Sequence, residues 1–174
     1  MAVELRYWRE DDAEAFTRAV HDSLDELRPW MPWAAEEPRS GSARLELIRE
    51  WERQRRDGGD VAYGIFVDGE VAGSCGMHRR IGEGGLEIGY WVRSDLTGRG
   101  IATEAARRLC ELAFEDPTIG RVEIHHDRAN AASGRVPAKL GFELAEENRD
   151  VPEAPGEEGV ELVWRLTREA WEQR

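Results

Sequence analysis

Hydrophobic residues along the chain recur in some stretches at the two-residue period of strands and in others at the spacing of helices. The alternation from Val3 to Trp8 predicts a strand, after which Asp11 and Asp12 are placed to cap a helix. The start of the chain is therefore expected to supply one strand and one helix. We expect that helix to turn one apolar face inward, formed by Ala15, Phe16, Ala19, Val20 and Leu24.

A segment rich in proline and tryptophan interrupts this pattern and predicts an irregular loop. The prolines and tryptophans of this segment are Pro29, Trp30, Pro32, Trp33 and Pro38. A helix is expected next, from about Ser42 to Arg56, because apolar residues there return to helical spacing. They are Leu45, Ile48 and Trp51.

The middle of the chain predicts three strands followed by a long helix. The strands Val61–Val67 and Val71–His78 meet at Asp68-Gly69, which is a strong hairpin signal. The third strand, Leu86–Val92, leads through a glycine turn into a helix from Gly100 to Phe114. The inward face of that helix is expected to carry Ala102, Ala105, Ala106, Leu109 and Ala113.

The remaining pattern completes a sheet. Val122–His126 predicts a strand, and a short helix is expected after Asn130. Two final strands, Phe142–Ala145 and Val160–Leu166, flank a loop rich in Glu, Pro and Gly. Such alternation of strands and helices predicts one mixed α/β sheet.

Length and charge narrow the class of protein. At 174 residues the chain fits one domain spanning residues 1–174. Its 24 basic and 36 acidic residues give a net charge of −12, which argues against a nucleic-acid partner because phosphate binding needs clustered Lys and Arg. The same charge suits a cationic amine substrate, or merely solubility. No apolar run of about eighteen residues and no basic leader is present, so we expect a cytoplasmic protein without a membrane partner.

Cysteine and histidine give no metal-site signal. Cys75 and Cys110 are too few and too far apart for a disulfide scaffold or a metal cluster, so we expect buried free thiols, neither of them a nucleophile. His125 and His126 are adjacent on a predicted strand, and adjacent strand residues point to opposite faces. No metal is therefore expected.

The turn between the third strand and the long helix carries the clearest chemical signal. Gly98 and Gly100 flank Arg99, and two glycines one residue apart allow a tight bend beside the free N–H groups of a helix start. Such a turn suits a phosphate or pyrophosphate. Thr103 stands where a dinucleotide fingerprint needs its third glycine, and no Lys follows as a nucleoside triphosphate loop requires. The alternative is a turn that merely links a strand to a helix.

Two segments resemble signatures of the GNAT superfamily of N-acetyltransferases. Thr97–Ala102 (T-G-R-G-I-A) is similar to the Q/R-x-x-G-x-G/A motif that grips the pyrophosphate of acetyl-coenzyme A (acetyl-CoA), although Thr97 replaces Gln or Arg. Asn130–Phe142 resembles the N-x-x-S-x-R-V-x-x-K-L-G-F signature of the Rim-type (RimJ/RimL-like) branch, whose founding members acetylate α-amino groups of ribosomal proteins. Three further segments also resemble the family and occur in its order along the chain: Arg28–Trp33, Leu86–Trp91 and Leu166–Trp171.

The resemblance implies a fold and a cofactor site. The expected GNAT fold is a central mixed, mostly antiparallel twisted sheet of about seven strands, flanked by four or five helices and splayed between the fourth and fifth strands. Acetyl-CoA enters at that splay in relatives, and no metal is needed. The residues expected at the cofactor are Trp91, Val92, Arg93, Thr97, Gly98, Arg99, Gly100, Ile101, Ala102, Thr103, Asn130 and Ser133.

Acetyl transfer needs a neutral amine, a stabilised oxyanion and a departing thiolate. Glu87 is the expected general base, acting through water with a pKa raised by an apolar cleft, and a salt-bridged strand Glu is the alternative. Backbone N–H groups around Tyr90 to Val92 are expected to meet the oxyanion. Many relatives place a Tyr near the thiolate, but this chain has Pro137 there, so Ser133 is expected either to serve the sulfur or to cap its turn and contact pantetheine.

The resemblance places the acceptor site under the Pro- and Trp-rich loop. The residues expected to bind the acceptor are Trp30, Trp33, Glu87 and Tyr90. Tryptophan rings can cradle a cationic amine or pack onto the core, and Glu36 and Glu37 can face the ammonium or form a solvated turn. Arg93 and Arg99 are expected near the phosphates, while Arg107 and Arg108 are expected in solvent.

We therefore expect an N-acetyltransferase that moves an acetyl group from acetyl-CoA directly to a primary amine in a ternary complex. The acceptor is a protein α-amine or a small-molecule amine. Succinyl-CoA is an alternative donor, for which His78 or Arg79 supplies a cation. A catalytically silent acyl-CoA sensor and a ligand-free scaffold are the alternatives of other classes. Relatives often form homodimers, but no residue here specifies an interface.

Overall fold

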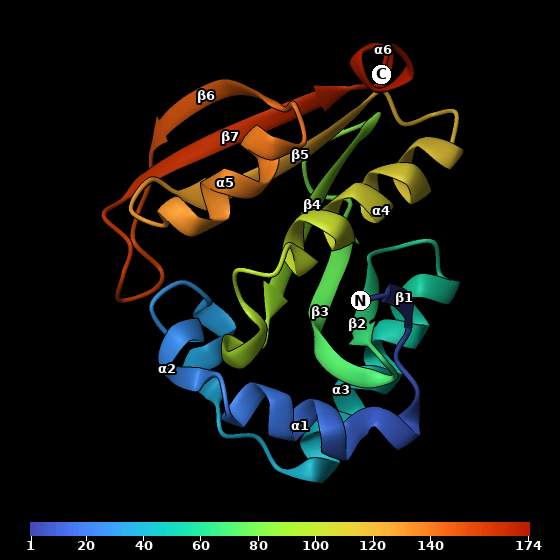
Figure 1. The fold of residues 1–174 in the computed structure, drawn as a ribbon, viewed down its shortest axis with the longest axis vertical. Helices are drawn as coiled ribbons and strands as arrows, with labels where there is room; N and C mark the ends of the chain where they lie inside the picture. Colours follow the sequence, from blue (N-terminus) through green and yellow to red (C-terminus); the bar gives the residue numbers. More distant parts are fainter.

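A computed structural model describes residues 1–174 as one seven-stranded sheet in the order β1-β2-β3-β4-β5-β7-β6, shown in Figure 1. Every neighbouring pair is antiparallel except β4 and β5, which run parallel. The seven-stranded, mostly antiparallel sheet predicted from the sequence is therefore confirmed. The strands are β1 Val3–Tyr7, β2 Val61–Val67, β3 Glu70–His78, β4 Gly85–Val92, β5 Arg121–Asp127, β6 Glu143–Arg149 and β7 Val160–Thr167.

Helices cover both faces of the sheet. One face of β4 packs through Leu86 and Ile88 against the core that includes Leu109 of the long helix α4. The opposite face meets α1 and α3 through a second apolar cluster, in which Trp8 stacks on Phe16 at 4.1 Å between ring centroids. The helices are α1 Ala13–His21, α2 Leu24–Leu27, α3 Gly41–Arg56, α4 Ile101–Glu115, α5 Ala131–Lys139 and α6 Arg168–Glu172.

The sheet opens between β4 and β5. The two strands pair only from Gly85 to Glu87, opposite Arg121 to Glu123, and beyond Glu87 they diverge. The predicted splay between the fourth and fifth strands is thus present. It leaves the last part of β4 without a partner on its β5 side, so backbone groups there are free to meet a ligand.

Several local predictions need correction. Asp12 stands at the N-cap of α1, but its carboxylate accepts from the N–H of Arg9 and pairs with Arg6 instead of capping the helix. Ala15 is exposed, and Leu24 belongs to the separate helix α2. Strand β6 continues to Arg149 because it pairs with β7, although all its side chains are exposed and give no alternating signal. Helix α6 was also missed.

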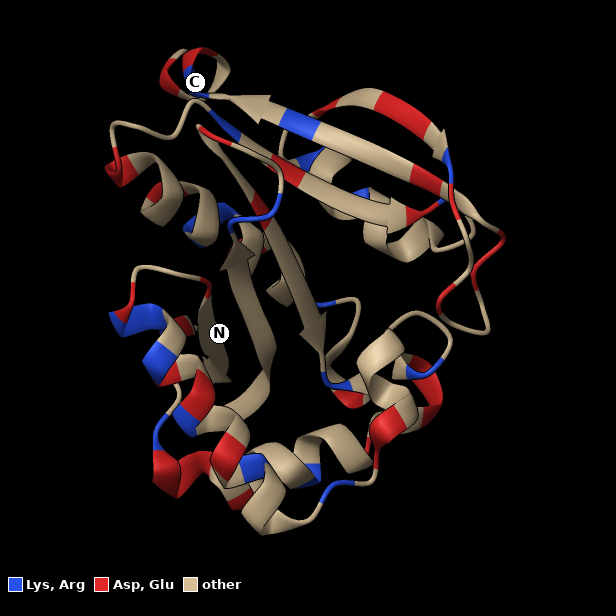
Figure 2. Cartoon of the chain, turned by 180° about the vertical axis from the view of Figure 1, so that it is seen from behind, with Lys and Arg blue, Asp and Glu red and all other residues tan.

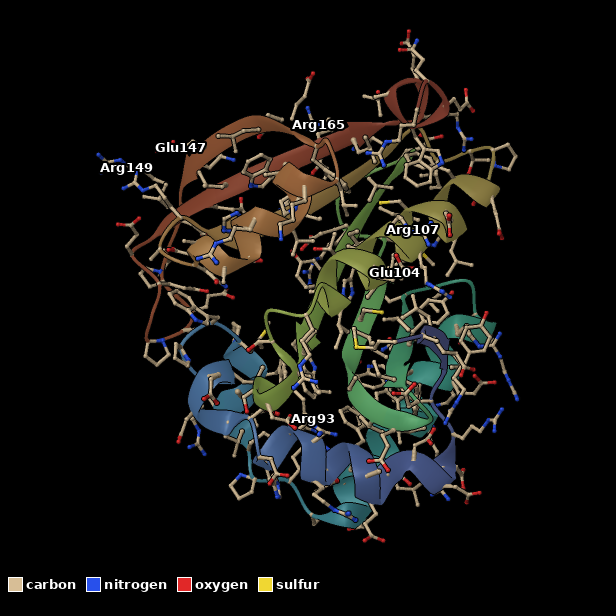
Figure 3. All side chains as sticks on the ribbon, viewed as in Figure 1. Arg93, Glu104, Arg107, Glu147, Arg149 and Arg165 are labelled. Carbon is tan, nitrogen blue, oxygen red and sulfur yellow. The ribbon has the colours of Figure 1, made fainter.

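Charged side chains on the helices largely neutralise one another. Figure 2 shows acidic and basic residues interspersed along α3, where Arg55 and Arg56 both pair with Glu52. On α4, Arg107 pairs with Glu104 (Figure 3), and Arg108 pairs with the same carboxylate. These arginines therefore form no free basic patch.

Candidate active site

The turn before α4 presents free backbone donors. Gly98 and Gly100 have φ angles of 76° and 80°, in the left-handed region that favours glycine, and Gly100 is the N-cap of α4. No N–H group from Gly98 to Thr103 has an acceptor on the backbone, and no side chain caps the helix. A run of unpaired N–H groups at the positive end of a fifteen-residue helix is suited to a phosphate.

The two arginines near this turn differ in their freedom. Arg93 lies where β4 enters the turn (Figure 3), and its guanidinium is held by the carboxylate of Asp95 and the carbonyl of Val71. Arg99 is exposed and makes only a 3.4 Å contact with the carbonyl of Asp95. Thr97 donates its hydroxyl to the carbonyl of Ser94. Arg99 is therefore the side chain free to meet an incoming anion.

The free edge of β4 faces the splay. The N–H of Arg93 donates to the carbonyl of Ala72 beside it, and N–H groups alternate sides along a strand. The N–H groups of Val92 and Tyr90 therefore point away from β3, into the opening between β4 and β5. Trp91 offers no free N–H to the splay, since its backbone faces β3, and its ring packs among aromatic side chains of the second core cluster.

Helix α5 closes the other side of the splay. Asn130 caps it by accepting from the N–H of Ser133, which leaves the amide N–H groups of Asn130 without a protein partner. The Tyr90 hydroxyl donates to the carbonyl of Ser133 at 3.0 Å and lies 3.5 Å from its Oγ. Burial raises the pKa of Tyr90 to about 12, so its hydroxyl is a neutral donor. Tyr90, Asn130 and Ser133 thus meet at one end of a cleft.

The cleft has a volume of about 700 Å³ and runs from Ser133 to the Pro- and Trp-rich loop. Glu87 lines its centre and is 8% exposed. Both oxygens of Glu87 accept hydrogen bonds from Arg80, at 2.6 and 2.7 Å. Burial by itself raises the pKa of Glu87, but these bonds and the nearby His125 outweigh it and hold the pKa below the usual range. The expected raised pKa is therefore wrong, because the sequence did not reveal Arg80 as a partner.

His125 extends this network across β5. Its Nε2 lies 2.7 Å from Glu123 and its Nδ1 lies 3.1 Å from Glu161 and 4.0 Å from Glu87. Burial disfavours the charged ring, but these carboxylates outweigh it and raise the pKa of His125. His126 points to the opposite face, where its Nε2 accepts from the indole of Trp164. Both histidines border the cleft, but their rings lie on opposite faces of β5, and no group of three His, Cys, Asp or Glu is arranged to hold a metal ion.

The Pro- and Trp-rich loop roofs the far end of the cleft, and both of its tryptophans line the cavity. Trp33 lies 6.1 Å from Trp91, centroid to centroid, so it also packs on the core. Trp30 is met by the loop between β6 and β7, whose Gly156 donates its N–H to the carbonyl of Pro29 at 2.8 Å. The roof of the cleft is therefore formed where two loops that are far apart in the sequence contact each other.

The two acidic residues of the roof differ in exposure and in their partners. Glu36 is exposed and pairs with Arg39. Glu37 is buried and accepts from Arg44 at 2.6 Å, so it is neither the solvated residue nor the free carboxylate that the sequence allowed. This ion pair ties the roof to α3 through Arg44.

The two residues expected as possible cations for a succinyl group lie in different places. Arg79 is not part of the cleft and lies 4.0 Å from Asp116, beyond the end of α4. His78 lines the cleft, and its Nδ1 lies 2.9 Å from Asp60. Sequence reasoning missed Asp60, because a residue just before one strand and a residue at the end of the next share no local motif. Both cysteines are buried free thiols, as expected.

Comparisons with known proteins agree on one family. A family model described as an acetyltransferase (GNAT) domain matches residues 2–143. The putative ribosomal N-acetyltransferase YdaF of Bacillus subtilis is 28% identical over 172 residues, covering 98% of this chain and 93% of the relative. The structure of Mycobacterium smegmatis RimJ in complex with CoA-disulfide superposes with a TM-score of 0.86 at 27% identity, over 96% of this chain and 82% of the other.

Solved structures with lower sequence identity to this chain also have the same fold. A structure of RimL, a ribosomal L7/L12 alpha-N-protein acetyltransferase in complex with coenzyme A, superposes with a TM-score of 0.88 at 21% identity, covering 98% of this chain and 96% of that one. None of the helices described above has both the length and the apolar character needed to cross a bilayer.

Proposed function

The chain belongs to the GNAT acetyltransferase family, and we propose that it transfers an acetyl group from acetyl-CoA directly to a primary amine in a ternary complex. The splay carries this proposal. It joins a phosphate-type turn and the Asn130 end of α5 on one side to a cleft lined by aromatic and acidic residues on the other. A thioester that reaches through the splay meets an amine in that cleft without a covalent enzyme intermediate.

Each part of the cofactor has a matching part of the chain. The N–H groups of residues 98–103 and the guanidinium of Arg99 bind the diphosphate. The free amide of Asn130 contacts the pantetheine arm, and the Ser133 hydroxyl, 3.5 Å from that of Tyr90, donates to the departing sulfur. The N–H groups of Tyr90 and Val92 stabilise the oxyanion, since they face the opening at which the carbonyl arrives.

The cleft suits an acceptor that arrives as a cation. Trp30 and Trp33 offer aromatic faces to an ammonium group, and Glu87 stays ionised because of Arg80. A carboxylate with a lowered pKa is a weak proton acceptor, so Glu87 binds and orients the amine instead of deprotonating it. The loop between β6 and β7 adds further acidic side chains at the cleft, Glu153 and Glu157 among them.

We propose a protein N-terminal α-amine as the acceptor. The support is the likeness to YdaF, named as a putative ribosomal N-acetyltransferase, over nearly the whole of both chains. Ribosomal acceptors imply a cytoplasmic enzyme. A small-molecule amine is the alternative acceptor. A homodimer stays a prediction.

The first test asks which acyl-CoA donor the protein binds, by measuring the melting temperature of the protein with and without each donor. A ligand that binds only the folded state adds about 2.7 kcal/mol at a hundredfold excess over its Kd, so acetyl-CoA should raise Tm by several degrees. A larger shift with succinyl-CoA would favour succinyl transfer, and no shift with either would reject the transferase. Acetylation of peptides with free α-amines, set against diamines and amino sugars, then separates the acceptor classes. A shift without turnover of any amine would favour the silent sensor.

A further inference from the structure

His78 and Asp60 form an imidazole–carboxylate pair beside the acceptor position. We propose that His78 is the general base that removes the proton from the acceptor amine, with Asp60 as its positioning residue. The inference rests on the acetyl transfer proposed above. The acceptor amine must lose one proton before it can attack the thioester, and Glu87 is poorly suited to accept that proton.

The hydrogen bonds define which nitrogen of His78 is the base. Asp60 accepts from the backbone N–H of Arg79 through Oδ1 at 2.9 Å, while its Oδ2 lies 2.9 Å from Nδ1 of His78. Burial raises the pKa of Asp60, but these bonds outweigh it and lower the pKa. An ionised carboxylate only accepts, so Nδ1 carries the hydrogen and Nε2 of the neutral ring bears the lone pair.

Nε2 of His78 opens onto the cleft. His78 on β3 is the register partner of Glu87 on β4, so both side chains leave the same face of the sheet. A Cβ built on Gly89, which shares that face two residues further along β4, would lie 3.9 Å from Nε2 and within 4 Å of no other atom. Gly89 also precedes Tyr90, whose N–H faces the splay. Nε2 therefore borders open space next to the expected position of the thioester carbonyl.

The groups that share the centre of the cleft with His78 are already bound, whereas the free carboxylate of Glu153 lies on the loop between β6 and β7. Glu87 gives both oxygens to Arg80, and His125 has a carboxylate at each nitrogen. His126 uses Nε2 for Trp164 and Nδ1 for the carbonyl of Asp127. Of the three histidines that line the cleft, only His78 keeps a nitrogen without a protein hydrogen bond. Imidazole is also the side chain whose charge changes near neutral pH, as a general base requires.

The proton and bond changes balance without a further reactant. The acceptor ammonium gives one proton to Nε2, and its nitrogen then forms a bond to the acetyl carbon. The carbon–sulfur bond breaks as the oxyanion collapses, and the sulfur takes the second proton of the attacking nitrogen, relayed by the Ser133 hydroxyl. The imidazolium then releases its proton to solvent, giving the amide, free coenzyme A and one proton.

Rates across pH test this assignment, with acetyl-CoA saturating and a peptide bearing a free N-terminal Ala or Ser as acceptor. We expect His78→Gln to lower kcat/KM about 10²- to 10⁴-fold near pH 7, the usual contribution of general base catalysis. The loss should shrink as pH rises and the amine deprotonates unaided. Asp60→Asn should cause a smaller loss and shift the pH profile to a different midpoint. Asp57→Asn, at the exposed C-cap of α3 and outside the cleft, is the matched control for Asp60→Asn and should keep the wild-type profile.

Two further measurements keep the result unambiguous. Equal Tm shifts with acetyl-CoA in wild type and His78→Gln would show that the fold and donor site survive, whereas no shift in wild type would reject the transfer reaction itself. Nitrogen NMR of the His78 ring in the wild-type enzyme should show the Nδ1–H tautomer. An Nε2–H tautomer, or a His78→Gln variant with wild-type rate and pH profile, would overturn the assignment.

Discussion

The hydroxyl of Tyr90 donates a 3.0 Å hydrogen bond to the carbonyl of Ser133, joining β4 to α5 across the splay. In a regular helix that carbonyl would accept from the N–H four residues later, at position 137. Pro137 has no N–H, so the carbonyl is left for Tyr90. The departure from the family pattern at Pro137 therefore has a structural counterpart, which is a bond between strand β4 and helix α5 beside the position that we propose for the thioester.

Tyr90→Phe removes this bond and should cost about 1 kcal/mol of unfolding free energy, the usual net worth of one hydrogen bond. The cost should shrink in a Pro137→Ala background, because the substituted alanine supplies an N–H for the Ser133 carbonyl. Urea unfolding of the two single variants and the double variant gives this coupling as a double-mutant cycle. Equal costs of Tyr90→Phe in both backgrounds would contradict the exchange of partners.

Gly100→Asp should abolish the Tm shift with acetyl-CoA, because it places a negative charge at the helix N-terminus that we propose binds the diphosphate. Gly58→Asp is the matched control. Gly58 also has a positive φ, 75°, and open space around its Cβ position, but it follows α3, away from the splay. Both changes should cost about 1–2 kcal/mol of stability from left-handed backbone strain. Loss of the shift in both variants, or in neither, would refute this turn as the phosphate site.

The ion pair between Glu37 and Arg44 should dominate the stability of the roof. Both side chains are almost fully buried, at 0% and 2% exposure, so Glu37→Gln leaves the Arg44 cation without a counter-charge. We expect a loss of about 3–5 kcal/mol. Glu36→Gln, at an exposed neighbour, should change stability by less than about 0.5 kcal/mol. Chemical denaturation compares the two, and a mild effect of Glu37→Gln would mean that water reaches Arg44.

The sequence predicted the sheet and the glycine turn before α4 because both depend on local signals. The mainly apolar runs of β2 and β3, their Asp68-Gly69 turn and the paired glycines before α4 each fix a conformation over a few residues. The cleft depends instead on partners from separate elements. Arg80 reverses the pKa shift expected for Glu87, and Asp60 orients His78, yet neither pairing leaves a mark in residue spacing. The continuation of β6 beyond Ala145 was missed for a related reason, since a fully exposed edge strand carries no hydrophobic period.

His125 and His126 should contribute to stability with opposite dependence on pH. Carboxylates raise the pKa of folded His125 above its ordinary value of 6.5, so its contribution is complete below about pH 6.5 and lost as pH rises through the folded pKa. Burial lowers the pKa of His126, so its contribution is present above about pH 6.5 and lost as pH falls through the folded pKa. Urea unfolding at about pH 5.5 and 8.5 should therefore show His125→Gln most destabilising at the lower pH and His126→Gln most destabilising at the higher one. Parallel pH dependence in the two variants would show that the three carboxylates around His125 do not hold its charge, and that the cleft is less negative than its lining implies.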